Sequence, residues 1–298
     1  MSNTSVLTKF LLNDEVSVVA CDTTALVREA KEIHGTYPVA TAVLGRTLSA
    51  AVMMASQLKH ESHNLTININ GGGPAGTIIA TAKADGTVKG CIANPEVNLP
   101  AREDGKLDVG GAVGTDGFLT VVKDIGLKEP YVGRTQLESG EIAEDLAYYY
   151  LQSEQQPTVV YLSVWVDVDT SVLTAGGLII SPLPGASEKT LSQIEERLFV
   201  VNNYALMLMQ QTPAEAVKNI FKGMDVKELE EMHPRYECDC AEERIEQVII
   251  SLGEKEIRDM IEEDGKAEVV CRFCNKKYTF DAAHLSRLLS EATAKGQE

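Results

Sequence analysis

Two close cysteine pairs constrain the fold of this chain more than any other sequence feature. Cys238 and Cys240 form a C-x-C motif in RYECDC, and Cys271 and Cys274 form a C-x-x-C motif in VVCRFC. Residues two or three apart lie close enough to form a disulfide with little chain movement, and they can also present two sulfurs to one metal ion. The pairs therefore allow three interpretations: disulfides, a metal site, or a site that changes from one to the other.

The expected cellular location argues against permanent disulfides. No stretch of the chain approaches the roughly 18 to 20 consecutive apolar residues of a membrane span. The start, MSNTSVLTKFLLNDEV, lacks the basic and apolar regions of a signal peptide, so we expect a cytoplasmic protein with no membrane partner. Because the cytosol keeps thiols reduced, a constitutive disulfide framework is the least favoured interpretation.

A zinc site fits the cysteine spacing best. Structural zinc is commonly held by four thiolates that arrive as two close pairs from distant chain positions. The C-x-C half is less common in zinc ribbons than C-x-x-C, but the pattern as a whole predicts one Zn²⁺ per chain. The predicted ligands are Cys238, Cys240, Cys271 and Cys274. His233 lies near this group but is not needed, because four thiolates complete the shell.

The remaining cysteines and histidines receive no role. Cys21 and Cys91 lie in apolar predicted strands, where an inert buried thiol is the usual case. The other four histidines are expected at the surface or in ordinary hydrogen bonds: His34, His60, His63 and His284.

The order of predicted elements indicates an α+β fold in three parts. Residues 1–185 contain strands and helices that do not alternate regularly, which predicts a mixed-sheet domain. Residues 186–231 are predicted to be a helical linker whose apolar faces pack on that domain and become a sticky surface if they detach. Residues 232–298 form a small acidic piece of 67 residues, a size at which a metal or disulfides usually support the core.

Local signals mark several element ends. Asn13-Asp14 predicts a turn between two strands, and Gly35 predicts the end of a helix. TYPVATAVLGRTLSAAVMMASQLK is a long apolar helix with the composition of a core element. Thr212, followed by Pro213 and by Glu215, predicts a capping box at the start of a linker helix that should stop by Gly223.

Charge and loop composition disfavour nucleic acids and nucleotides. The formal net charge of -17 repels phosphate backbones, so we expect no nucleic acid as main partner. NGGGPAG at 70–76 lacks the Lys-Ser/Thr of a P-loop and joins two predicted strands, so we interpret it as a turn.

Energetics distinguish the metal from the disulfides. Structural zinc supplies roughly 10 to 16 kcal/mol of apparent binding free energy in small domains. A disulfide that closes a loop of three or four residues stabilises by only about 2 kcal/mol. Oxidised sulfurs are also lost as ligands. Oxidation is therefore expected to release the ion and to destabilise the small domain.

Several long motifs resemble those of a known family, the redox-regulated thirty-three-kilodalton heat-shock proteins, also called the 33 kDa chaperonins. The resemblance covers essentially the whole chain. It rests on the cysteine pattern and on three stretches: HGTYPVATAVLGRTLSA at 34–50, NGGGPAG at 70–76, and GKLDVGGAVGTDGFLTVVKDIGLKEPYVG at 105–133.

The resemblance implies an ATP-independent holdase rather than an enzyme, inactive while reduced and zinc-bound. It implies that oxidants convert the four cysteines to Cys238–Cys240 and Cys271–Cys274 disulfides and release the zinc. It further implies that the linker at 186–231 then loosens, that oxidised subunits form homodimers, and that unfolding client proteins are captured. The contacts with clients do not carry over, because no short motif defines them.

Two other functions stay open at this level. A thiol-disulfide oxidoreductase could use Cys271 and Cys274, but such enzymes place C-x-x-C at the start of a helix, whereas here it joins two predicted strands. A zinc ribbon that binds a partner constitutively would be indifferent to oxidants.

Overall fold

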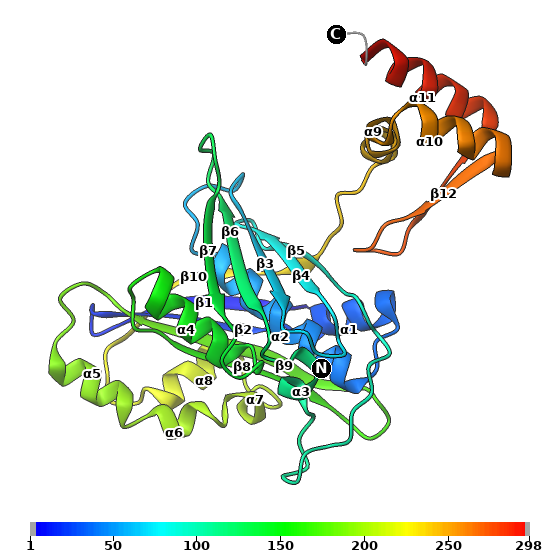
Figure 1. Ribbon diagram of the computed structural model, residues 1–298. Helices are drawn as coiled ribbons and strands as arrows, with labels where there is room; N and C mark the ends of the chain where they lie inside the picture. Colours follow the sequence, from blue (N-terminus) through cyan, green and yellow to red (C-terminus); the bar gives the residue numbers. More distant parts are fainter. Residues whose placement is uncertain (1–3, 296–298) are drawn as a thin grey trace. The chain divides into compact units, whose positions relative to one another are not determined.

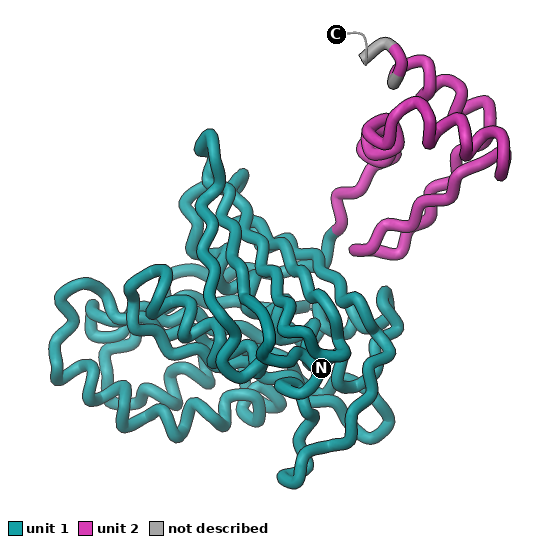
Figure 2. The backbone as a smooth tube through the Cα atoms, viewed as in Figure 1, with its two compact units in different colours: residues 1–237 teal, residues 238–298 magenta. Residues whose placement is uncertain are grey.

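The chain folds into two compact units. The computed structural model describes residues 4–295. The units comprise Met1–Glu237 and Cys238–Glu298, coloured separately in Figure 2. The first unit therefore extends beyond residue 231, where the sequence placed the end of the linker, and the second unit begins at the first cysteine of the C-x-C motif.

The first unit contains a five-stranded antiparallel sheet (Figure 1). Its order is β10-β1-β2-β9-β8. A tight turn at Asn13 and Asp14, both with positive φ, connects β1 to β2. The strands are β1 (Val6–Leu12), β2 (Val16–Asp22), β8 (Val159–Val166), β9 (Val172–Pro182) and β10 (Val226–Met232).

A six-stranded sheet forms the other layer of this unit. Its order is β11-β5-β4-β3-β6-β7. All pairs are antiparallel except the short parallel pair of β11 with β5, which makes the sheet mixed. The strands are β3 (Asn64–Asn70), β4 (Ile78–Lys83), β5 (Thr87–Ile92), β6 (Phe118–Asp124), β7 (Tyr131–Gln136) and β11 (Arg235–Tyr236).

Helix α2 (Pro38–Ala55) forms the centre of the core between the two sheets. Its side chains share one apolar cluster with strands of both sheets, and almost all of its residues are buried. It is the one helix in the described part of the chain with the length and apolar composition to cross a membrane, and its burial is that of a core helix. Helix α1 (Thr24–His34) precedes it and ends at Gly35 in the left-handed conformation, as predicted. The other two helices before β8 are α3 (Val109–Val113) and α4 (Ala143–Ser153).

Four short helices cover the opposite face of the five-stranded sheet. They are α5 (Glu188–Glu195), α6 (Leu198–Val201), α7 (Tyr204–Met207) and α8 (Pro213–Ile220). Because side chains alternate across a strand, Val19 of β2 faces the α2 core while Val18 faces these helices. The predicted capping box at Thr212 is present, since Glu215 Oε2 accepts a 2.8 Å hydrogen bond from the Thr212 backbone amide.

The end of the 186–231 segment is a strand rather than a helix. VKELEEM forms β10 and pairs with β1, where Lys9 Nζ lies 2.7 Å from Glu230 Oε2. The edge of β1 offers unpaired backbone groups, and pairing with them outweighs the weak preference of these charged residues for a helix. The chain then runs into β11, which pairs with β5 and ends the first unit.

The second unit is a small helical piece with one β-hairpin. Strands β12 (Lys266–Val270) and β13 (Lys277–Asp281) pair antiparallel. They are the two strands predicted on either side of the C-x-x-C motif. Around them lie α9 (Glu242–Leu252), α10 (Glu254–Asp259), a π-helical turn η1 (Met260–Asp264) and α11 (Ala282–Lys295). Among the residues that the structure describes, its apolar core contains nine buried residues, one of which is Cys271. A core of this size gains much from a metal cross-link.

Candidate metal centre

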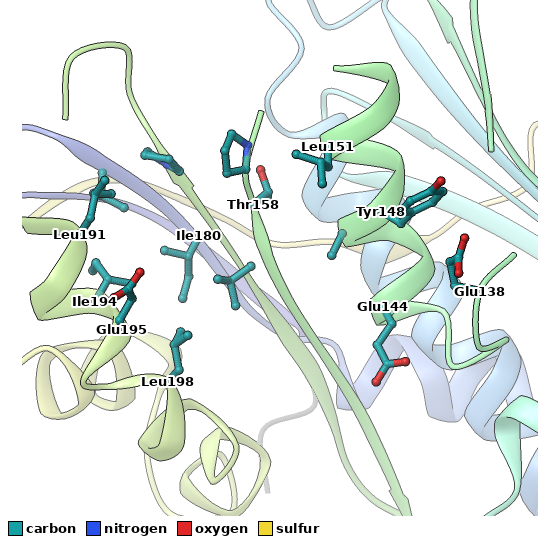
Figure 3. Close-up of a pocket in the computed structure, with 15 residues that line it drawn as sticks. Glu138, Glu144, Tyr148, Leu151, Thr158, Ile180, Leu191, Ile194, Glu195 and Leu198 are labelled. Carbon is teal, nitrogen blue, oxygen red and sulfur yellow. The ribbon is translucent and has the colours of Figure 1, made fainter. Parts of the chain in front are cut away.

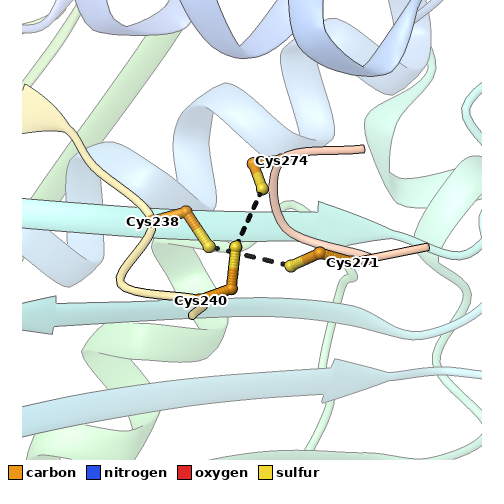
Figure 4. Close-up of side chains that lie close together, drawn as sticks. All are labelled: Cys238, Cys240, Cys271 and Cys274. Atoms are coloured by element: carbon orange, nitrogen blue, oxygen red, sulfur yellow. Dashed lines mark hydrogen bonds between the residues drawn. The ribbon is translucent and has the colours of Figure 1, made fainter. Parts of the chain in front are cut away.

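An irregular segment and a turn of the second unit bring the four predicted cysteines together (Figure 4). Cys238 and Cys240 lie in the irregular segment before α9. Cys271 directly follows β12, and Cys274 lies in the turn before β13. That turn is closed by hydrogen bonds from the Asn275 amide to the Cys271 carbonyl (2.8 Å) and from the Cys271 amide to the Lys276 carbonyl (3.0 Å).

The sulfur geometry fits a tetrahedral zinc ion. All four Sγ atoms lie within 4.8 Å of one another. Cys238 Sγ is 3.7 Å from Cys271 Sγ, and Cys240 Sγ is 3.3 Å from Cys274 Sγ. Four sulfurs about 2.3 Å from one zinc ion lie about 3.8 Å apart in a regular tetrahedron. The four side chains could therefore hold a metal ion, and their donor set of four thiols is the one that zinc favours.

The thiols differ in how readily they ionise. Burial raises the pKa of Cys238 and of Cys274 above the ordinary thiol value. Burial also acts on Cys240, but the Tyr278 hydroxyl and the neighbouring thiols donate hydrogen bonds that lower its pKa to about 7. The group thus offers one sulfur that is already partly ionised near neutral pH, which favours the approach of a cation.

Tyr278 supports the site from β13. Its hydroxyl lies 3.2 Å from Cys240 Sγ and 3.1 Å from the Cys240 carbonyl oxygen. The contact with the Cys240 sulfur raises the pKa of Tyr278, so the phenol stays protonated and remains a donor. Tyr278 is not among the site residues that the sequence predicts. The sequence signal for a buried Tyr278 is the alternation of polar and aromatic residues in KKYTF, just after C-x-x-C. This alternation places Tyr278 on the buried face of a strand.

A second group of possible ligands in the same unit already contains a cation. Glu242, Glu246 and His284 lie close enough to share an ion. However, Arg287 Nη2 lies 2.6 Å from Glu246 Oε1, and His284 Nε2 lies 2.6 Å from the same oxygen. The guanidinium supplies the positive charge that a metal would bring, so we interpret this group as an ion-pair network between α9 and α11.

The residues without a predicted role lie outside the four-sulfur group. Cys21 is fully buried in β2, and burial raises the pKa of its thiol far above the ordinary value. Cys91 is half-buried in β5. His233 belongs to the first unit, where its Nδ1 lies 3.3 Å from the Ser5 carbonyl oxygen.

The first unit contains an apolar cavity of about 650 Å³. Figure 3 shows Leu151 of α4 on one side of the cavity and Leu191 and Ile194 of α5 on the other, with Ile180 of β9 between them. One wall of the cavity therefore belongs to the 186–231 segment. Any displacement of that segment would open the cavity and expose the apolar sheet face beneath it.

Comparisons with known proteins agree on one family. The family model described as Hsp33 protein matches residues 5–281. A protein named 33 kDa chaperonin from Alkaliphilus oremlandii is 47% identical over 292 residues, which cover 98% of this chain and 97% of the relative. A protein of the same name from Clostridium perfringens is 47% identical over 278 residues, 93% of this chain and 88% of the relative.

A solved structure shows the same similarity in three dimensions. The crystal structure of a 33 kDa chaperonin from Thermotoga maritima superimposes with a TM-score of 0.89 at 34% sequence identity. The match covers 98% of this chain and 100% of that one.

Proposed function

The chain belongs to the Hsp33 protein family, whose relatives are named 33 kDa chaperonins, and on that premise we propose that it is a redox-regulated, ATP-independent holdase. It binds unfolding proteins under oxidative stress and is inactive while reduced. The observation that carries this proposal is the convergence of Cys238, Cys240, Cys271 and Cys274 within 4.8 Å in the smaller of the two units.

In the reduced state, the four thiolates hold one Zn²⁺. The ion supplies a cross-link between the 238–240 segment and the β12–β13 hairpin, which are otherwise joined through a small apolar core. Cys271 belongs to that core, and the other three sulfurs pack against it. The chain's own contribution is to aim four sulfurs at one point through the hairpin turn and the irregular segment before α9.

Oxidation by a peroxide removes the ligands in two-electron steps. A thiolate attacks one peroxide oxygen, the O–O bond breaks, hydroxide leaves, and the sulfur becomes a sulfenic acid. The thiolate of the neighbouring cysteine then attacks this sulfur, an S–S bond forms, and a second hydroxide leaves. We propose that the products are the Cys238–Cys240 and Cys271–Cys274 disulfides, because each pair stays close in sequence after the ion has gone.

The energy balance makes this reaction a release mechanism. Two disulfides with loops of three or four residues stabilise by about 2 kcal/mol each, against roughly 10 to 16 kcal/mol for zinc. The second unit then loses most of the support for its small core. Since Cys238 directly follows Glu237, unfolding of the second unit also frees the chain that leads back to β11 and β10.

The surface proposed for clients is the one that the 186–231 segment covers. Side chains of β1, β2 and β9, among them Phe10, Val18 and Ile180, are buried under α5–α8. When these helices loosen, that apolar face and the adjoining cavity become available to apolar segments of unfolding proteins. Oxidised subunits then associate as homodimers.

The same proposal places the protein in the cytoplasm, without a membrane or nucleic acid as main partner and without catalytic turnover. The alternative, a thiol-disulfide oxidoreductase, requires an attacking thiolate at a helix start. Here Cys271 follows β12 and Cys274 precedes β13, so neither cysteine of that pair begins a helix. This placement favours the holdase.

Metal and thiol stoichiometry test the proposal. The reduced chain should carry one zinc, and hypochlorite, or peroxide with mild heating, should release it as the four cluster thiols disappear. The C91S variant is the matched control and should release its zinc in the same way, because Cys91 lies in β5 of the first unit. Zinc that stays bound after complete loss of the four thiols contradicts the proposal.

A further inference from the structure

Tyr278 is the side chain whose hydroxyl reaches the four-sulfur group from outside. It comes four residues after Cys274 in the chain, but its hydroxyl meets Cys240, 38 residues away. The oxygen lies 3.2 Å from Cys240 Sγ and 3.1 Å from the Cys240 carbonyl oxygen. The single hydroxyl proton of Tyr278 is therefore shared between the backbone carbonyl and the sulfur of the same cysteine.

The ring of Tyr278 is fixed independently of this contact. Its side chain is 5% exposed and belongs to the apolar core of the second unit, together with Phe280 on the same face of β13. Across the hairpin, Tyr278 pairs with Val269 of β12. Lys276 Nζ lies 4.9 Å from the ring centroid. A hydroxyl on so well-anchored a ring has a defined position, which is what an outer-shell partner of a metal ligand requires.

We propose that Tyr278 is a positioning residue for Cys240: its hydroxyl orients the Cys240 sulfur toward the other three sulfurs and slows the attack of that sulfur on oxidants. The proposal rests on the proposed zinc-bound reduced state. A hydrogen bond to a thiolate is charge-assisted and holds electron density that the sulfur would otherwise donate to an electrophile. Outer-shell hydrogen bonds of this kind also fix ligand orientation.

Two consequences follow for a chain that lacks only this hydroxyl. Zinc affinity falls, because the Cys240 backbone and sulfur lose the contact that aims them at the ion. Cys240 also becomes more reactive relative to Cys271. Disruption of the core alone would instead raise the reactivity of all four cysteines together. The ratio of the two rates therefore separates a positioning role from a structural one.

The test compares three full-length chains: wild type, Y278F and V269A. Y278F removes the hydroxyl and keeps the ring in the core. V269A removes two methyl groups directly across the hairpin and leaves the hydroxyl in place. Zinc affinity is measured by competition with a chromogenic chelator. Cysteine reactivity is measured on the zinc-loaded chains with N-ethylmaleimide, followed by mass spectrometry that resolves the modification of each cysteine.

The expected result for Y278F is a rise of about tenfold in the zinc Kd and a several-fold rise in the ratio of Cys240 to Cys271 modification. V269A should leave that ratio within twofold of wild type. A ratio that is unchanged in Y278F, or raised equally in V269A, overturns the proposal. If the wild-type chain binds no zinc, the proposed function itself fails. If wild type and Y278F bind zinc with the same affinity, only the proposed role of Tyr278 is refuted, and the proposed function stands.

Discussion

Cys240 Sγ lies 3.3 Å from Cys274 Sγ although 34 residues separate the two cysteines in the chain. The nearest sulfur contacts thus run between the C-x-C and C-x-x-C motifs, whereas the proposed disulfides form within each motif. A metal ion held by all four sulfurs would therefore tie distant segments together, whereas the proposed disulfides would not. Under the proposed function, this difference in what is cross-linked makes oxidation loosen the second unit rather than stabilise it.

Zinc binding should release protons. Burial raises the pKa of Cys238 and Cys274, so both thiols are protonated at pH 7, and Cys240, with a pKa of about 7, is partly protonated. Zinc binds thiolates, so these protons must leave when the ion enters. Calorimetric titration with zinc in buffers of different ionisation enthalpy should show the release of at least two protons per ion at pH 7.

The same linkage fixes the sign of the pH dependence. Because the displaced protons come from groups with a raised or near-neutral pKa, apparent zinc affinity falls as pH falls. The loss should be at least about 100-fold for each pH unit near neutrality, and larger below pH 7, where Cys240 also becomes protonated. Chelator competition between pH 6.5 and 7.5 measures it. An affinity that does not change over this range contradicts the four-thiol site.

Loss of one buried aromatic ring of the 186–231 segment should activate the reduced chain in part. Phe221 follows α8, is fully buried, and belongs to the cluster that joins α5–α8 to the sheet. Replacing such a ring with alanine costs about 3 to 5 kcal/mol. F221A should therefore bind an apolar fluorescent dye more strongly than wild type and suppress client aggregation to some degree without oxidant.

Phe199 provides the matched control for this prediction. It lies in α6 of the same segment, but 81% of its surface is exposed. F199A should behave like wild type in both assays. Circular dichroism checks that F221A keeps the two sheets of the first unit. A folded F221A with the dye binding of F199A would show that the linker helices do not cover the client surface.

The parts of the structure that could be predicted are those that local chemistry determines. Gly35 ends α1 because a left-handed residue is needed there, and Thr212 with Glu215 caps α8 through contacts three residues apart. The cysteine group could also be predicted, because four thiols in two close pairs favour one ion whatever the rest of the fold. The two strands predicted on either side of C-x-x-C are present as β12 and β13, and their hairpin places the second pair.

The parts that could not be predicted depend on tertiary partners. VKELEEM is charged and has no strand alternation, and it becomes β10 only because the edge of β1 accepts it. Residues 235–236 extend the first unit for the same reason, through the edge of β5. The alternation in KKYTF places Tyr278 on a buried face, but it does not identify Cys240, 38 residues away, as the contact of its hydroxyl.

Aggregation of a heat-denatured client, followed by light scattering without ATP, tests the central claim most directly. The assay compares the reduced, zinc-loaded chain with the same chain after oxidation and zinc release. The proposed function predicts that only the oxidised chain suppresses scattering, in proportion to its amount, and that reduction with zinc present abolishes the effect. Equal suppression by the reduced, zinc-loaded chain would show that the cysteines do not control activity.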